Sequence, residues 1–257
     1  MKQFLAISGV AAAIGLASVV PASASSITIG FTNGSRSADA VFANVGGNLV
    51  VTLTNTSGSD ALVPTDLLTA IFFDVAGNPS LTGTSADICA TCTVLNAPAV
   101  PTDPSPDGVG GEWAYSGGSS TLAFGANYAL SSTGLGIFGT GDLFPGANLA
   151  GPDDPDGPQY GITTAGDDPL TGNGGLAVPI IQNQVVFTLG GFGSLDPSRS
   201  ISKVTFLYGT ALDEPSFGGS CIGCGVTTQD AVPEPASLLL LGSGLAFAAK
   251  AIRRRRS

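Results

Sequence analysis

Short runs of alternating apolar and polar residues recur between residues 25 and 231, separated by Gly, Asn, Asp and Pro. In residues 48–55, Leu49, Val51 and Leu53 alternate with mainly polar neighbours. Successive side chains of a strand point to opposite faces, so this spacing predicts a strand with one buried face and one wet face. No segment of this region shows a convincing helical period.

Two further segments indicate how such strands are joined and buried. Residues 40–45 and 48–55 flank Gly46-Gly47. This arrangement predicts a two-residue hairpin, because both central positions of a type I′ turn need positive φ. Residues 67–75 are mostly apolar, which predicts a strand buried on both faces.

The other predicted strands are residues 26–32, 184–189 and 201–208, with shorter pieces at 112–116, 121–130 and 135–138. In the strand at 201–208, one face is predicted to carry Val204, Phe206 and Tyr208, and the other Lys203, Thr205 and Leu207. Residues 97–111 and 151–175 are predicted loops rich in Pro, Asp and Gly. Many short strands joined by turns predict an all-β fold, a single loop-rich antiparallel β-sandwich or jelly-roll-like domain.

The first 24 residues have the pattern of a secretory signal peptide. Lys2 supplies a positive start, residues 4–20 are apolar, and Ala22-Ser23-Ala24 has the small residues of a signal-peptidase site. Residues 1–24 are therefore predicted to be removed after Ala24, with Ala22 and Ala24 as the recognised positions. An uncleaved anchor is the alternative, which Pro21 and the following small residues disfavour.

Residues 232–257 combine three elements in a fixed order. Pro233, Glu234 and Pro235 precede an apolar stretch at 236–252, which is followed by Arg253, Arg254, Arg255 and Arg256. The stretch is long enough to cross a thin bilayer as a helix. Four arginines do not cross, so the basic tail is predicted to stay cytoplasmic and residues 25–231 to lie outside the cytoplasm. An ordinary single-pass tail anchor is the alternative.

This three-part tail resembles the PEP-CTERM sorting signal, which exosortases of Gram-negative bacteria recognise. Proteins with such tails are also grouped under an ice-binding C-terminal heading. The resemblance implies that an exosortase removes the anchor near Pro233, Glu234 and Pro235 and delivers the exported domain to the cell surface or to exopolysaccharide. Glycine-rich motifs between residues 156 and 210 also resemble a family of exosortase-dependent surface proteins. Both resemblances concern location and fold, and neither implies an activity.

Without the two targeting segments, the charge of the chain is strongly negative. Residues 25–231 keep three basic residues, Arg36, Arg199 and Lys203, against 18 acidic ones, which leaves a net charge of −15. Such a surface repels nucleic acid, whose binding requires basic residues that neutralise phosphates. The chain also has no histidine, which removes the commonest general base and the Ser-His and Cys-His nucleophile pairs. We therefore expect a non-enzymatic protein.

The four cysteines form two CxxC pairs, Cys89 with Cys92 and Cys221 with Cys224. Inside a cell this spacing suggests a Cys₄ zinc site, whereas in an exported protein disulfides are expected. Thiol redox chemistry is disfavoured because no helical pattern follows either pair. Local bridges are favoured over cross-pairing, because the cysteines of one CxxC are close in any turn, although the sequence leaves the connectivity open.

The acidic loops are a candidate calcium site, formed by Asp153, Asp154, Asp156, Asp167 and Asp168. Carboxylate and carbonyl oxygens of Asp- and Gly-rich loops are the ligands that Ca²⁺ prefers. The spacing is not that of an EF-hand, and solvated turns are the alternative reading. No other cofactor is expected.

Glu112 beside Trp113 is the third candidate for chemistry, because a carboxylate next to an aromatic ring suggests a sugar-binding platform or one half of a glycosidase pair. A core strand is the simpler explanation. The sequence thus leaves three functions. The main hypothesis is a surface or matrix protein associated with exopolysaccharide; the alternatives are a calcium- or carbohydrate-binding adhesion module and a carboxylate-based hydrolase.

Overall fold

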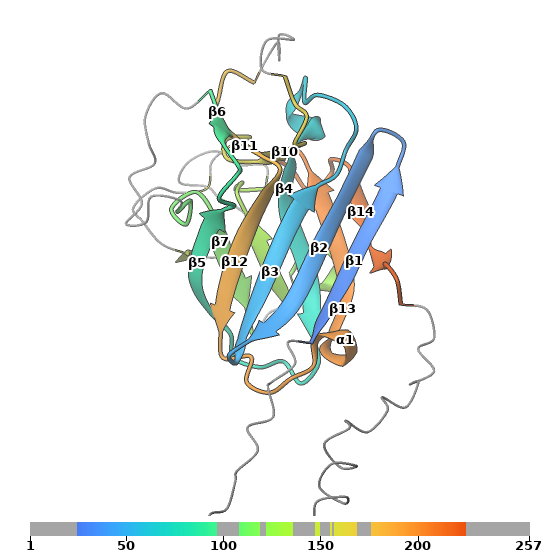
Figure 1. The fold of residues 1–257 in the computed structure, drawn as a ribbon, viewed down its shortest axis with the longest axis vertical. Coiled ribbons are helices and arrows are strands. Elements are labelled where there is room, and N and C mark those ends of the chain that lie inside the picture. The colour runs from blue at the N-terminus through green and yellow to red at the C-terminus, as the bar shows by residue number, and fades with distance from the viewer. Residues whose placement is uncertain are drawn as a thin grey trace, which may run out of the picture. The chain divides into compact units, whose positions relative to one another are not determined.

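The computed structural model describes residues 25–96, 108–118, 122–135, 147–149, 155, 157–168 and 176–224. They form two β-sheets that face each other across a hydrophobic core (Figure 1). The chain divides into two compact units, Met1–Ser220 and Cys221–Ser257, and the second is described only as far as Cys224. The all-β sandwich that the strand pattern predicts is confirmed.

The first sheet lies at the front of Figure 1 and has six strands in the order β15-β1-β2-β3-β12-β5. Within this sheet, β1, β2, β3, β12 and β5 lie side by side in that order, and each runs antiparallel to its neighbour. Gly46 and Gly47, at φ of 60° and 86°, form the predicted tight turn between β2 and β3. The strands are β1 (Ser26–Asn33), β2 (Arg36–Val45), β3 (Asn48–Asn55), β5 (Thr82–Ile88), β12 (Gln184–Gly190) and β15 (Ser220–Cys221).

The second sheet centres on β4 (Leu68–Val75), which pairs with β8 along one edge and β13 along the other. β10 and β11 are parallel, in contrast to the antiparallel pairing predicted for the sandwich. The other strands of this sheet are β6 (Val94–Leu95), β7 (Ala114–Gly117), β8 (Tyr128–Ser131), β9 (Ala147–Asn148), β10 (Ile162–Thr163), β11 (Ile180–Gln182), β13 (Ile201–Tyr208) and β14 (Ser216–Gly218).

β4 is buried on both faces, as its apolar sequence predicts. Phe73 points into the main core between the sheets and meets Phe42 of β2 edge to face, with 5.2 Å between the ring centres. Phe72 points the other way, into a second apolar cluster that contains Leu207 of β13. The strand can be apolar throughout because each face has its own cover.

The middle of the chain departs from the prediction. Of the predicted strand at 121–130, only the last residues belong to a strand, β8. Before it, η2 (Ala123–Gly125) is a 3₁₀ turn in which Phe124 has a φ of 58°. Leu135 is the only described residue of the predicted strand at 135–138, and its φ of 62° excludes a strand conformation there. Alternation of apolar residues does not reveal a positive φ at a residue other than glycine.

β13 (Ile201–Tyr208) carries Val204, Phe206 and Tyr208 on one face, as predicted, and the structure buries that face in the main core. Its register shifts between Ser202 and Thr205, next to the φ of 49° at Lys203. Such a bulge inserts a residue and increases the local twist of the strand. The sequence pattern also does not predict β5, because this edge strand is mostly polar and only one of its residues is fully buried.

The helices that the structure describes are short: η1 (Pro64–Asp66), η2 and α1 (Pro197–Ser200). None of the helices in the described part of the chain has the length and apolar character needed to cross a membrane. The predicted signal peptide at 1–24 and the predicted membrane helix at 236–252 both lie outside the described residues.

Candidate functional site

The first CxxC pair is a disulfide at a corner of the sandwich. Cys89 and Cys92 are bonded, with their Cα atoms 5.0 Å apart. Cys89 directly follows β5 of the first sheet, and Cys92 lies two residues before β6 of the second sheet. The bridge therefore closes the turn through which the chain passes from one sheet to the other.

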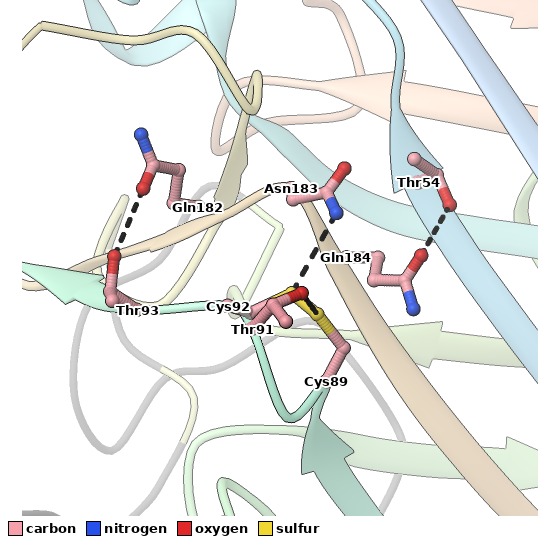
Figure 2. Close-up of a disulfide and its surroundings, with 8 residues drawn as sticks. All are labelled: Thr54, Cys89, Thr91, Cys92, Thr93, Gln182, Asn183 and Gln184. Atoms are coloured by element: carbon pink, nitrogen blue, oxygen red, sulfur yellow. Dashed lines mark hydrogen bonds between the residues drawn. A yellow bond between two sulfur atoms is a disulfide. The ribbon is translucent and has the colours of Figure 1, made fainter.

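A second segment changes sheets beside this bridge (Figure 2). Asn183 alone joins β11 of the second sheet to β12 of the first, at a φ of 82°. Its side-chain amide donates a hydrogen bond to Sγ of Cys92 at 3.8 Å, and Thr93 Oγ1 donates to Oε1 of Gln182 at 2.9 Å. We call residues 89–93 with 182–183 the disulfide corner; it ties two sheet crossings together.

The second CxxC pair is also bridged locally. Cys221 and Cys224 are bonded, with Cα atoms 5.6 Å apart, in the second compact unit. All four cysteines are therefore oxidised. The structure contains neither the cross-paired arrangement nor the Cys₄ zinc site among these residues.

A clamp formed by Arg36, at the start of β2, fixes the loop that follows β3. Arg36 Nη2 lies 3.0 Å from Oδ1 of Asp66, and its Nε donates to the carbonyl of Thr65 at 2.8 Å. The second carboxylate oxygen of Asp66 accepts from the backbone N–H groups of Leu62 and Val63 at 3.2 and 3.3 Å. The ion pair and the hydrogen bond from Arg36 to Thr65 hold this loop against the first sheet, and the two bonds to Asp66 close the loop on itself.

The clamp borders a hollow of about 210 Å³. The hollow brings together one guanidinium group, two carboxylates and three serine hydroxyls. Such a lining offers hydrogen bonds to a polar ligand. Its residues are Ser35, Arg36, Ser57, Ser59, Asp60, Leu62 and Asp66.

Buried hydrogen bonds connect the hollow to both sheets. Tyr208 of β13 is fully buried, and its hydroxyl donates to the carbonyl of Ser37 at 2.9 Å. Burial raises the pKa of the Tyr208 hydroxyl, which therefore stays protonated as a donor. On the other side, Thr164 Oγ1 donates to the carbonyl of Ser57 at 2.6 Å. The Tyr208 hydroxyl also lies 3.4 Å from the hydroxyl of Ser57, so both Tyr208 and Thr164 anchor the loop at 57–66.

Asp167 is the most unusual carboxyl group at this end of the sandwich, because only 3% of its surface is exposed. Thr163 Oγ1 donates to its Oδ2 at 2.7 Å. Burial raises the pKa of Asp167, the charges of Asp60 and Asp168 raise it further, and hydrogen bonds from Thr163 and the Ala61 backbone partly oppose this shift. The backbone N–H of Asp168 donates to Asp60 Oδ1 at 3.3 Å, which joins the two loops.

The structure tests only part of the predicted calcium site. Asp167 and Asp168 share one turn, whereas Asp153, Asp154 and Asp156 lie outside the described residues. Among the residues that are described, no three Asp, Glu, Cys or His side chains are grouped so that they could hold a metal ion. The structure adds Asp60, which the sequence analysis did not include; its only local signal is the Ser-Gly-Ser-Asp turn at 57–60.

The suggestion that Trp113 forms a sugar-stacking platform is wrong. Its side chain is fully buried in the main core, where the ring meets Phe187 edge to face at 4.9 Å. Glu112 is also mostly buried, with 9% of its surface exposed. A ring packed between two sheets cannot stack on a soluble sugar, so Trp113, directly before β7, has the core role that was the simpler explanation.

Comparison with known protein families identifies one segment. The model of the PEP-CTERM protein-sorting motif matches residues 231–256, a segment outside the described residues. No curated protein and no solved structure matches the chain. The match covers the predicted Pro-Glu-Pro, apolar and arginine elements, and it supports an exported protein that an exosortase targets and that is anchored in a membrane during transit. The chain carries a PEP-CTERM protein-sorting motif at residues 231–256.

Proposed function

We propose that this chain is a non-enzymatic surface or matrix protein, which an exosortase processes and which is retained with extracellular polysaccharide. The observation that carries the proposal is the sorting motif at residues 231–256. The predicted signal peptide at 1–24 supplies the entry to the export route that such a motif requires. The proposal assigns the domain at 25–231 a structural role outside the cytoplasm.

Features of the domain support such a role. The local bridge at Cys89 and Cys92 suits an oxidising compartment, where disulfides persist. The net charge of −15 over residues 25–231 favours solubility within a hydrated matrix. The absence of histidine from the chain and the buried position of Trp113 support a non-enzymatic protein over a hydrolase.

Replacing Pro233, Glu234 and Pro235 with alanine tests the sorting step. The variant should accumulate in the membrane fraction at a higher mass than the processed protein, because the anchor stays attached. Deleting the exosortase should give the same species. A chain of unchanged mass and location in both strains would contradict the proposal. The matched control is a double-alanine change at Leu212 and Asp213, two exposed residues of a turn in the exported domain.

A second candidate, a calcium-binding adhesion module, is favoured by the turn at Asp167 and Asp168 together with Asp60. Three carboxyl groups that interact unfavourably in the absence of a cation are stabilised when a cation binds. Such a site would also need oxygen ligands from elsewhere, with Asp153, Asp154 and Asp156 as candidates. Calorimetry of the exported protein with Ca²⁺ should then show binding that Asp167→Asn abolishes and Asp87→Asn preserves. No heat of binding to the parent protein would retire this candidate.

A further inference from the structure

The outward side of the first sheet is a broad surface with little charge. Thr28, Val41, Thr52 and Val186 lie in one row across four strands, according to the pairing of β1, β2, β3 and β12. Their chain neighbours, such as Val51 and Phe187, are fully buried in the core, so these side chains point away from it. We call the outward side of β1, β2, β3, β12 and β5 the outer face; it faces the viewer in Figure 1.

The outer face differs chemically from the rest of the exported domain. Asp39 and Asp87 are the only charged residues among its outward positions, and none of those positions is aromatic. Threonine, valine and serine predominate, as in the next row, where Val50 lies opposite Thr188. Solvent-facing sheets usually carry charged side chains, which oppose association. This sheet lacks them at its centre, while the exported domain as a whole has a net charge of −15.

A second copy of the same sheet is the occupant that this chemistry fits. Small β-branched side chains allow two sheets to pack face to face at the usual spacing of about 10 Å. A polysaccharide would find no aromatic ring to stack on. A cationic partner would find only two carboxylates here and far more negative charge elsewhere on the domain.

The size of the outer face indicates a weak contact. Five strands about 4.8 Å apart, with about seven residues each at about 3.4 Å, cover roughly 600 Å². Two such faces bury about 1,200 Å² in total, which is the lower limit for a specific interface. An association of this strength is reversible and becomes important where many copies are displayed together.

We propose that the outer face is a self-association surface, on which a second copy of this chain packs sheet against sheet. The inference rests on the proposed function, because display at a surface or in a matrix is what brings copies together. The acidic remainder of each copy repels its partner, and salt screens this repulsion. Association should therefore strengthen as the ionic strength rises.

Sedimentation velocity on the full exported protein, in the form that the cells produce, tests the proposal. The parent protein should show a concentration-dependent dimer that increases with salt. Thr52→Lys with Val186→Lys places four ammonium groups in the dimer interface and should raise the dissociation constant at least about tenfold. The matched control, Val63→Lys with Leu212→Lys, adds the same charge at exposed positions off the outer face and should leave the dimer intact.

Circular dichroism of both double variants checks that they fold, and Thr188→Arg repeats the test with a single change on the same face. A parent protein that is monomeric at all salt concentrations would overturn the proposal, as would a dimer that survives the outer-face lysines. If the parent protein is monomeric and the variant with Thr52→Lys and Val186→Lys is no longer retained by polysaccharide, the outer face binds sugar. That result would also overturn the self-association proposal. Anchor removal is read separately from the mass of the mature chain, so failure of the sorting proposal is distinguishable from failure of this one.

Discussion

The side-chain amide of Asn183 donates a hydrogen bond to Sγ of Cys92 at 3.8 Å, and this contact joins two segments that are 91 residues apart in the sequence. Each segment crosses from one sheet to the other at this point, one through the Cys89–Cys92 bridge and the other through Asn183. The two sheets are therefore fastened at a corner by a covalent turn and by a single residue with positive φ. The stability of this corner should depend on both.

Replacing Cys89 and Cys92 with serine should lower the free energy of unfolding of the first unit by about 2 kcal/mol. The chain-entropy estimate for a ring of about four residues gives this value, well below the value for long loops. Urea unfolding of the oxidised parent and the double variant measures the difference. The matched control, Cys221→Ser with Cys224→Ser, removes a ring of the same size in the second unit and should leave the midpoint of the first unit unchanged. Equal losses in both variants would contradict this account.

Asn183 should tolerate glycine and reject a β-branched residue. Its φ of 82° lies in the left-handed region, which glycine adopts freely and valine strongly resists. Asn183→Gly should cost about 1 kcal/mol, because the contact with Cys92 is lost. Asn183→Val should cost roughly 1–3 kcal/mol more, because of backbone strain. Thermal unfolding of both variants makes the comparison, and equal melting temperatures would show that the backbone conformation is not the constraint.

Removing the hydroxyl of Tyr208 should destabilise the protein by about 1 kcal/mol, because Tyr208→Phe loses its hydrogen bond to the carbonyl of Ser37, which keeps the backbone N–H of Thr56 as a donor. Tyr115→Phe is the matched control. Its hydroxyl donates to the carbonyl of Leu81 over a longer distance, 3.3 Å, from a partly exposed side chain, and its loss should cost less. Urea unfolding ranks the two variants. A larger loss for Tyr115→Phe would show that the network beneath the hollow contributes little.

Asp167 should make the domain less stable as the pH rises. Its pKa is raised in the folded protein, chiefly by burial, so the folded state binds its proton more tightly than the unfolded state does. The stabilisation from this group is complete below the unfolded pKa of about 3.9 and is lost as the pH rises through the folded pKa. Asp167→Asn should therefore be more stable relative to the parent at pH 7 than at pH 3. Urea midpoints of the parent and of Asp167→Asn across this range test the sign.

Much of the sandwich is readable from local sequence. β3 has the predicted bounds, and β4 and β12 differ from prediction by only one residue. In β3 and β12 the alternating apolar residues report directly on burial, because the side-chain period of a strand is two. In β4 the continuous apolar run reports burial on both faces. The pattern of apolar residues predicts neither the polar edge strand β5 nor the left-handed conformation of Phe124. An edge strand is held by backbone hydrogen bonds to its neighbour, which any side chain permits.

In the candidate site, too, the sequence indicates single residues but does not indicate which of them meet in the folded protein. Asp167 and Asp168 stand out in the sequence as acidic loop residues, but their contact with Asp60 spans 108 positions. In the sequence, Trp113 beside Glu112 suggests a binding residue, whereas in the folded protein its side chain is fully buried between the sheets. Both results depend on which loops the sheet order brings together, and no local period encodes that order.

The sequence by itself determined the sorting motif at residues 231–256, which supports export, and which residues of most strands face the core. Sorting signals are linear, because the export machinery reads them as an extended or helical segment, and strand faces follow from the alternation of neighbouring residues. Only the tertiary structure decided that two sheet crossings meet at Cys92 and Asn183, and that rows of threonine and valine align into one face with little charge. Those features depend on the register between strands that are distant in the sequence. No single strand determines this register, because it is fixed only when the strands form their shared core.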